Sequence, residues 1–190
     1  MNNILEKFQE LKRKRGFELN LYLKNKSEKL VHFFQESKID AVVIGMSGGI
    51  DSALVTALMI HIAGLKNSPL KKVSGVLAPI FGEGTSGQEE ALNRAKIQCE
   101  KWSAKYDFFE SNVVNLSSAY QSIIGAHPVK GNAWAEGQMA SVLRTPLFYY
   151  HADLLQQQGY RSLVCGTTNR DEGAYIGFYG KASDAMLALL

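Results

Sequence analysis

Short apolar runs alternate with longer stretches of helical periodicity along this chain of 190 residues. In the longer stretches, apolar residues recur every three or four positions, which is the spacing of an amphipathic helix. The short runs are bounded by turn-forming or polar residues and predict buried strands at 41–44, 73–78, 108–116 and 162–165. Because strands that alternate with helices form βαβ units, the pattern predicts an α/β fold with a parallel sheet and helices on both faces.

The start of the chain has a helical pattern of its own. Its apolar positions predict an amphipathic helix over 3–15, ended by Gly16: Ile4, Leu5, Phe8 and Leu11. We therefore expect an N-terminal helix in residues 1–16 and the main domain in residues 17–190. The main domain begins with apolar residues at alternate positions, which predict a strand: Phe17, Leu19, Leu21 and Leu23.

Two further helices are expected on either side of the strands. Ser27 is placed as an N-cap. The helix that follows it is expected to bury Leu30, Val31, Phe33 and Phe34. A long helical pattern covers 134–158 and contains Pro146. Proline lacks a backbone N–H and clashes with the preceding turn, so we expect a break or kink near Thr145.

Composition narrows the class of protein. A net charge of +3 is too small to indicate a nucleic-acid partner. Cys99 and Cys165 lie far apart and show no metal-ligand spacing, which favours a reducing cytoplasm and disfavours a sulfur-transfer enzyme. No apolar run reaches the roughly 18 residues of a membrane span, and the first residues do not resemble a secretory signal. We expect a cytoplasmic protein without nucleic-acid or membrane partners.

A glycine-rich loop follows the first predicted strand, and its residues are Gly45, Met46, Ser47, Gly48, Gly49, Ile50, Asp51 and Ser52. Adjacent glycines allow a tight turn and a close approach of the backbone to a ligand. A helix is predicted to begin directly after them, and its unpaired N–H groups favour a phosphate. The alternative is an ordinary strand–turn–helix connection that Asp51 caps.

The string Ser-Gly-Gly-Ile-Asp-Ser differs from both common nucleotide loops. It lacks the Gly-Lys-Ser/Thr ending of a Walker A loop and the Gly-x-Gly-x-x-Gly of a dinucleotide fold. It resembles the pyrophosphate loop of the ATP pyrophosphatase superfamily, whose members cleave ATP between its α- and β-phosphates. In that reading Asp51 does not bind phosphate directly, because like charges repel, and instead holds a magnesium ion that bridges the phosphates.

A second string makes the resemblance more specific. After the fourth predicted strand the chain reads Gly166, Thr167, Thr168, Asn169, Arg170, Asp171 and Glu172. Gly-Thr-x-Asn-x-x-Glu after a pyrophosphate loop is similar to the NAD synthetase family, and the similarity covers about residues 17–186. The resemblance implies an adenine nucleotide alpha hydrolase-like fold, with Rossmann-like layers. On the residues alone, Asp171 and Glu172 are equally well explained as acids at a helix N-terminus.

The family resemblance also implies a reaction and a set of site residues. The reaction is ATP-dependent amidation of deamido-NAD to NAD with ammonia, through an acyl-adenylate and with release of pyrophosphate and AMP. The ATP-binding positions implied are Gly45, Ser47, Gly48, Gly49, Ile50, Asp51, Ser52, Pro79, Gln88 and Thr167. The other positions implied are Asp51 and Glu172 for Mg²⁺, Asn132, Arg144, Lys181 and Asp184 for deamido-NAD, and Asp51 and Lys181 for catalysis.

The chain departs from the family pattern in two places. The family has two arginines on the long helix, whereas here Arg144 is matched and Val142 stands two positions before it. Ala188 occupies the position where a substrate-binding Asp is expected. The resemblance therefore implies a synthetase domain that is incomplete at its C-terminus, with the residues after about Gly173 loosely fixed. The alternatives are an inactive ATP-binding module and another pyrophosphate-loop enzyme, such as a GMP synthetase or a tRNA-modifying enzyme.

The long helical segment also indicates whether the chain binds another subunit. It carries more apolar side chains than one buried face needs: Trp134, Met139, Val142, Leu143, Leu147, Phe148, Tyr149, Leu154 and Leu155. Burial of a second face usually requires another layer or another subunit, so we expect a homodimer, as the resemblance also implies. No glutaminase domain is recognised in the sequence, so any use of glutamine would involve a separate subunit.

Overall fold

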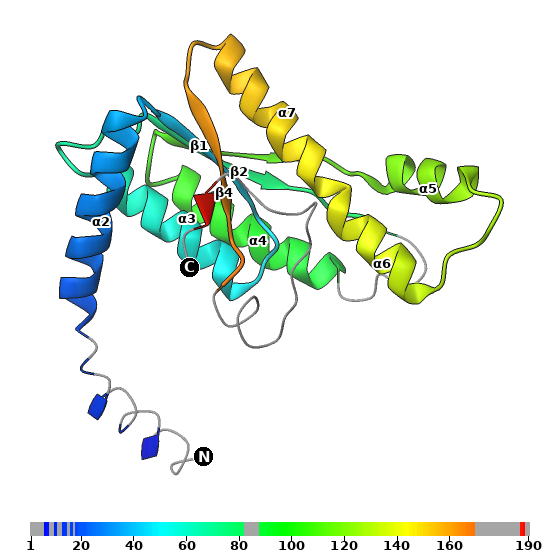
Figure 1. The fold of residues 1–190 in the computed structure, drawn as a ribbon, viewed down its shortest axis with the longest axis horizontal. Helices are drawn as coiled ribbons and strands as arrows, with labels where there is room; N and C mark the ends of the chain where they lie inside the picture. The colour runs from blue at the N-terminus through cyan, green and yellow to red at the C-terminus, as the bar shows by residue number, and fades with distance from the viewer. Residues whose placement is uncertain are drawn as a thin grey trace.

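The computed structural model describes residues 18–81 and 88–169, isolated positions before residue 18, and the backbone of residues 187–188. Its centre is a parallel five-stranded sheet with the strand order β3-β2-β1-β4-β5 (Figure 1). The strands are β1 Ala41–Gly45, β2 Lys72–Leu77, β3 Phe109–Val113, β4 Ser162–Gly166 and β5 Leu187–Ala188. The parallel α/β fold and all four predicted strands are confirmed. The predicted N-terminal helix lies mostly outside the described residues.

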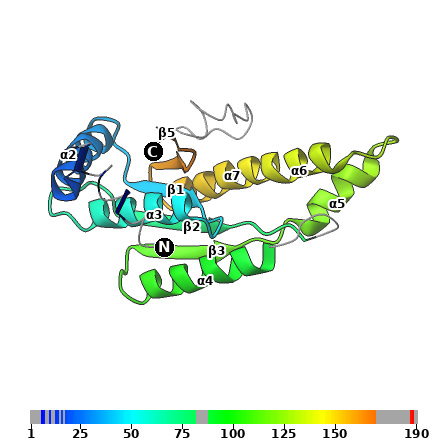
Figure 2. The ribbon, with the colours of Figure 1, turned by 90° about the horizontal axis from the view of Figure 1, so that it is seen from below.

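Helices lie on both sides of this sheet, as predicted. Figure 2 shows α3 and α4 on one side and α7 on the other, with α5 and α6 extending beyond the sheet. The helices are α2 Leu19–Glu36, α3 Ile50–Ala63, α4 Gln88–Ser103, α5 Ser117–Ala126, α6 Ala133–Val142 and α7 Arg144–Gln157. Among the described residues, no helix combines the length and apolar character that crossing a membrane requires.

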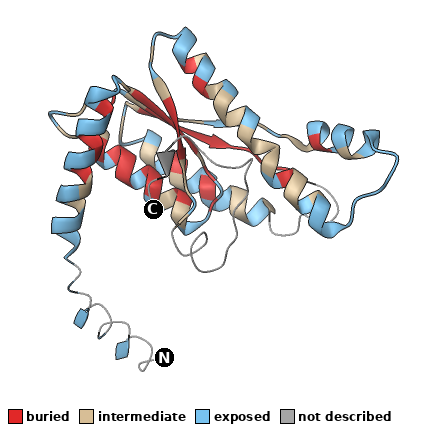
Figure 3. Ribbon diagram, in the orientation of Figure 1, coloured by how far each residue is buried: buried red, intermediate tan, exposed pale blue. Residues whose placement is uncertain are grey.

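Strand β1 is apolar throughout because both of its faces are covered. Val42 and Ile44 join the core formed with α2, α3 and α4, while Ala41 and Val43 join the core under α7. Successive side chains of a strand point to opposite faces, so this division follows directly from the pleat. All four side chains are fully buried, and Figure 3 shows the central strands in red between half-exposed helices.

The strand predicted at the start of the main domain is wrong. Residues from Leu19 onward form α2, an α-helix of 18 residues. The alternating side chains Leu19 and Leu21 are more than half exposed, so no sheet face buries them. Leucine and lysine favour helices, and this segment is continuous with a helix whose later turns are packed against the core. The short alternating pattern of apolar residues is therefore outweighed by the tendency of this segment to continue the helix.

Two details predicted for α2 are also wrong. Ser27 is not its N-cap: it lies in the middle of the helix, where it is buried and its hydroxyl has no hydrogen-bond partner among the described residues. The helix begins eight residues earlier. Leu30, Val31 and Phe34 are buried as predicted, whereas Phe33 is 37% exposed and touches Phe34 only edge to face.

The predicted break in the long helix is confirmed. Helix α6 ends at Val142 and α7 begins at Arg144, two residues before Pro146. Pro146 therefore lies in the first turn of α7. Backbone N–H groups of a first turn have no acceptor within the helix, so proline costs little at this position.

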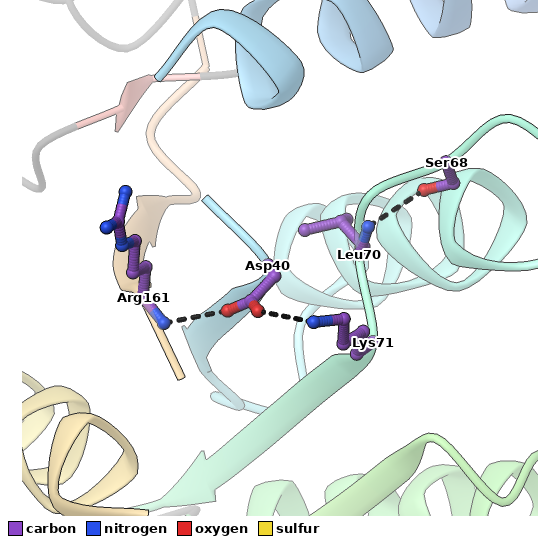
Figure 4. A network of polar contacts seen from close by, with 5 residues as sticks. All are labelled: Asp40, Ser68, Leu70, Lys71 and Arg161. Carbon is purple, nitrogen blue, oxygen red and sulfur yellow. Dashed lines mark hydrogen bonds and ion pairs between the residues drawn. The ribbon is translucent and has the colours of Figure 1, made fainter. Parts of the chain in front are cut away.

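The amino ends of the central strands are joined by one carboxylate. Asp40, next to β1, accepts hydrogen bonds from the backbone N–H of Arg161 at 2.7 Å and from the Lys71 ammonium at 3.0 Å (Figure 4). The backbone carbonyl of Asp40 also accepts from the Lys71 N–H at 2.8 Å. The starts of β1, β2 and β4 are thus fixed together at the edge opposite the glycine-rich loop.

Candidate functional site

The carboxyl ends of three strands meet at one edge of the sheet. Gly45 of β1 is paired with Val76 of β2, and Ile44 is paired with Cys165 of β4. Ser47, Pro79 and Thr167 follow these strands by one or two residues. Ligands of open parallel sheets bind beyond the carboxyl ends of the strands. The predicted ATP-binding segments therefore lie at the edge where this fold places its ligands.

The hydroxyl groups of the glycine-rich loop bond to one another. The Ser47 N–H donates to Ser52 Oγ at 3.3 Å, and the Oγ atoms of these two serines are 3.0 Å apart. The Gly49 N–H donates to Ser47 Oγ at 3.2 Å, and the Ser52 hydroxyl donates to the Gly49 carbonyl oxygen at 3.1 Å. These bonds hold a compact turn over the first residues of α3.

The N-terminus of α3 has no side-chain cap. Its N-cap residue is Gly49, and no side chain there accepts a hydrogen bond from the first turn. Asp51 is therefore not the cap that the alternative interpretation assigned to it, although it is an acid in the first turn. Free N–H groups and the dipole of a helix of 14 residues together favour an anion at this point.

Gly48 needs to be glycine for two reasons. Its φ is +79°, a region that L side chains rarely adopt. A Cβ at this position would also overlap the backbone carbonyl oxygen of Ala91 in α4. The carbonyl oxygen of Gly48 accepts a hydrogen bond of 3.2 Å from Nε of Arg94, also in α4. The loop is therefore packed directly against the backbone of α4.

Gly45, at the end of β1, is required by a contact on the other face of the sheet. A Cβ there would lie 2.5 Å from the ring of Phe148 in α7. Phe148 packs with the core on the α7 side of the sheet. Any larger residue at Gly45 would force this ring to move.

Asp51 has the chemistry of a magnesium ligand. Its carboxylate is half-buried beside the uncapped helix end, and no side chain in the described part of the chain pairs with it. The described residues contain no cluster of three acidic, His or Cys side chains that could hold a metal alone. Mg²⁺ usually binds one or two carboxylates and completes its shell with water and substrate phosphates, so a lone carboxylate fits it. The second predicted ligand, Glu172, lies outside the described residues.

Gln88 and Arg144, predicted to contact ATP and deamido-NAD, contact each other. Nη2 of Arg144 donates to Oε1 of Gln88 at 3.3 Å. Its Nε and Nη1 donate at 2.9 Å to the carbonyl oxygens of Ala78, just before Pro79, and of Ala140. Burial lowers the pKa of Arg144 from its ordinary value. Arg144 therefore joins the end of β2 to the start of α4 and the end of α6.

The remaining predicted substrate residues are placed differently. Asn132 caps α6, and its side-chain oxygen accepts the N–H of Ala135 at 2.9 Å. Its carboxamide is exposed, and the structure does not bring it into a contact with the loop residues. Lys181, Asp184 and the segment after about Gly173 lie outside the described residues, so these expectations stay predictions.

Neither cysteine has the character of a reactive thiol. Cys99 and Cys165 are both free and buried. Burial raises the pKa of Cys165 to about 12. Burial also raises the pKa of Cys99, against the opposing effect of a hydrogen bond with Ser111. Both are protonated near neutral pH, and a protonated thiol is a poor nucleophile.

Two residues at this edge were missed by the sequence analysis. Arg94 contacts the loop although 46 positions separate it from Gly48. Phe148 reaches Gly45 from the far end of the chain. Neither residue belongs to a recognisable motif, and only the packing of α4 against β2 and β3 and of α7 against β1 brings them to the loop.

Comparison with known proteins agrees with this geometry. The family model described as NAD synthase matches residues 22–190. The chain belongs to the NAD synthase family. It is 30% identical over 174 residues to the NH₃-dependent NAD⁺ synthetase of Carboxydothermus hydrogenoformans, with 87% of this chain and 62% of that protein covered. It is 32% identical over 158 residues to the Thermococcus kodakarensis protein of the same name, covering 83% of this chain and 52% of the relative.

The chain therefore spans about half to three fifths of the length of these NAD synthase relatives. A solved structure supports the fold assignment independently. The NH₃-dependent NAD synthetase of Campylobacter jejuni superposes with a TM-score of 0.72 at 21% identity, covering 92% of this chain and 67% of that one. The adenine nucleotide alpha hydrolase-like fold implied by the resemblance is confirmed.

Proposed function

We propose that this chain carries the ATP site of a ligase that converts deamido-NAD to NAD with ammonia as the nitrogen donor. The observation that carries the proposal is the placement of the Ser-Gly-Gly-Ile-Asp-Ser string. It lies at the carboxyl edge of the sheet, over a helix N-terminus without a side-chain cap, beside the Asp51 carboxylate, which no described side chain pairs with. Membership of the NAD synthase family supplies the substrates.

The reaction has two steps. In the first, an oxygen of the nicotinate carboxylate attacks the α-phosphorus of ATP, and the bond between that phosphorus and the oxygen bridging to the β-phosphate breaks. Pyrophosphate leaves and an acyl-adenylate remains. In the second, ammonia attacks the acyl carbon, the carbon–oxygen bond to AMP breaks, and a proton leaves the nitrogen as the amide forms.

The first step needs alignment and charge stabilisation rather than a protein nucleophile. In our assignment, Ser47, Ser52 and the amides around Gly49 bind the β- and γ-phosphates. These phosphates would replace the bonds that the loop groups now make with one another. Because the leaving pyrophosphate carries the developing negative charge, donors fixed before the reaction stabilise it without reorganisation. In this assignment, the rest of the ATP molecule contacts Pro79, Gln88 and Thr167.

Asp51 would hold Mg²⁺, together with Glu172. When bound, magnesium neutralises charge on the phosphate oxygens and favours departure of pyrophosphate. Lys181 and Asp184 remain assigned to deamido-NAD and Lys181 to catalysis. We also assign Arg144 to deamido-NAD. Its hydrogen bonds to the carbonyl oxygens of Ala78 and Ala140 fix the orientation of the guanidinium group that would make this contact.

The working form is proposed to be a homodimer in the cytoplasm. Trp134 of α6 is 68% exposed and Tyr150 of α7 is 59% exposed, whereas most of the other apolar side chains predicted as a surplus are half-buried in one chain. A second copy would cover the exposed side chains. Light scattering at micromolar concentration should give twice the chain mass. The ammonia is either free or supplied by a separate glutaminase subunit, and the two free buried thiols suit a reducing compartment.

The proposal is tested by a turnover assay with ATP, Mg²⁺, ammonium and deamido-NAD, scored for NAD and pyrophosphate. We expect both products in equal amounts, and neither when deamido-NAD is omitted. Asp51→Asn is the matched control, because it keeps the size of the side chain and removes its charge. ATP binding without either product would instead favour an inactive ATP-binding module, and turnover of another acid substrate would favour a different pyrophosphate-loop enzyme.

A further inference from the structure

Helix α4 touches the glycine-rich loop at two points on one peptide unit. A Cβ on Gly48 would overlap the carbonyl oxygen of Ala91, and the carbonyl oxygen of Gly48 accepts from Nε of Arg94 at 3.2 Å. Ala91 and Arg94 are three positions apart, so they lie on the same face of α4. This face of α4 is therefore the surface on which the loop rests.

The hydrogen bond from Arg94 fixes the orientation of the whole peptide unit between Gly48 and Gly49. A peptide unit is planar, so the Gly48 carbonyl and the Gly49 N–H point in opposite directions and turn together. The Gly49 N–H donates to Ser47 Oγ at 3.2 Å on the other side. Arg94 and Ser47 thus hold one peptide from both sides. The N–H that this peptide presents to the inside of the loop is one of the donors that our assignment gives to phosphate.

The same helix reaches the other part of the proposed nucleotide site. Gln88, the first residue of α4, accepts from Arg144, which is anchored to the Ala78 carbonyl at the end of β2. Two turns later, Arg94 holds the loop that follows β1. Side chains of α4 therefore reach both the loop that follows β1 and the arginine anchored at the end of the neighbouring strand β2.

We propose that Arg94 is a positioning residue that holds the phosphate loop in the shape that receives the β- and γ-phosphates of ATP. It acts through the Gly48–Gly49 peptide and does not touch the reacting atoms. The proposal rests on the function proposed above. It adds a residue that none of the motifs in the sequence contains and that lies on an element separate from the loop.

A plain charge effect is the competing explanation. The Arg94 side chain is 53% exposed and Nη1 lies 3.4 Å from the Glu90 carboxylate, so the guanidinium could attract phosphate from a distance. Such attraction is screened by salt, whereas a hydrogen bond to a buried backbone carbonyl is affected much less. Lys96, two positions further along α4, is exposed and provides a matched loss of one positive charge without a contact to the loop.

The experiment compares the full chain with its Arg94→Met, Lys96→Met and Glu90→Gln variants. Amide hydrogen exchange is measured for the peptide covering 46–53 without nucleotide, and affinity for ATP with Mg²⁺ is measured at low and at high salt. We expect Arg94→Met to exchange severalfold faster in this peptide and to bind ATP about tenfold more weakly at both salt concentrations. Lys96→Met and Glu90→Gln should match the unchanged protein in both measurements.

In a turnover assay, Arg94→Met should raise KM for ATP and leave KM for deamido-NAD unchanged, whereas a general loss of structure would alter both. Unchanged exchange in the loop of Arg94→Met overturns the proposal. A binding defect that disappears at high salt, or that Lys96→Met shares, also overturns it in favour of charge alone. If the unchanged chain binds no ATP, the proposed function fails, but loop exchange still decides whether Arg94 holds the loop.

Discussion

The two edges of the central sheet use polar groups in opposite ways. At the amino edge, the Asp40 carboxylate is satisfied by the Arg161 N–H and by Lys71, so its charge is used entirely within the protein (Figure 4). At the carboxyl edge, α3 begins without a side-chain cap, and Asp51 has no partner among the described residues. The first arrangement contributes to stability, whereas the second leaves donors and a carboxylate available to a ligand.

The largest effect is expected from a change that deforms the carboxyl edge. Gly48→Ala combines a φ of +79° with an overlap against the Ala91 carbonyl oxygen. The left-handed conformation alone costs a residue with a Cβ about 1–2 kcal/mol, and relief of the overlap must move the loop or α4. We expect ATP affinity to fall by about 100-fold, which corresponds to about 2.7 kcal/mol. Calorimetric titration with ATP and Mg²⁺ measures it.

Gly64→Ala is the matched control for this change. Gly64 follows the end of α3 at a φ of −75°, and a Cβ there would make only ordinary contacts at 3.5 Å or more. Gly64→Ala should bind ATP as the unchanged protein does. If Gly48→Ala also keeps its affinity, the close fit between the loop and α4 has no role in nucleotide binding.

A smaller effect is expected from Asp51→Asn, which should leave the fold intact. The change removes a carboxylate that no described side chain neutralises, and the loss of a favourable acid in a first turn costs about 0.3–1 kcal/mol of stability. ATP affinity in the presence of Mg²⁺ should fall by about tenfold or more. The affinity of the variant should no longer depend on Mg²⁺, as titrations with magnesium and with a chelator will show. Unchanged affinity would exclude the metal-ligand role.

A substitution at the amino edge should lower the stability of the fold and leave ATP affinity nearly unchanged. Asp40→Ala removes a carboxylate that is 17% exposed and accepts two hydrogen bonds, so we expect a loss of about 1–3 kcal/mol in the free energy of unfolding. ATP affinity should stay within about twofold, because the change lies at the edge opposite the loop. Urea unfolding and calorimetry measure the two quantities. Loss of ATP affinity without loss of stability would reverse the roles we give to the two edges.

Lys71→Met sharpens the same comparison. The Lys71 side chain is 70% exposed, so its ion pair with Asp40 should contribute only about 0–1 kcal/mol. Most of the stability lost in Asp40→Ala should therefore be absent in Lys71→Met. Equal losses would mean that the ion pair, and not the bond to the Arg161 N–H, fixes the strand ends.

The smallest effect concerns pH and the face of the sheet under α7. His151 lies 2.8 Å from the Ser74 hydroxyl, and burial lowers the pKa of its imidazole, with Lys72 acting in the same direction and Glu110 opposing them. A lowered pKa means that the unfolded chain binds this proton more readily. Stability is therefore lost as pH falls below about 6.5, the ordinary value for histidine, down to the folded-state pKa.

His151→Gln should remove this part of the pH dependence. Glutamine can still bond to Ser74 but does not titrate, so the urea midpoint should change less between about pH 7 and pH 5 than in the unchanged protein. The difference is limited to about 1.4 kcal/mol for each unit by which the pKa is lowered. An identical pH dependence in the two proteins would show that other groups control the response.

The sequence predicted the central strands well because their apolar runs are bounded by clear turn signals. It also located the glycine-rich loop between β1 and α3, since glycines, hydroxyls and a carboxylate are consecutive there. The start of α2 was mispredicted because Leu19 and Leu21 alternate without being buried. Arg94 and Phe148 could not be predicted, because their contacts with Gly48 and Gly45 depend on how whole helices pack against the sheet.

The central claim is that the carboxyl edge of the sheet, and not its amino edge, receives ATP. Hydrogen exchange with and without ATP and Mg²⁺ tests it in a single measurement. We expect slower exchange in the peptides covering 46–53, 77–80 and 166–169, and unchanged exchange around Asp40, Lys71 and Arg161. Protection around Asp40 with none in 46–53 would contradict the claim.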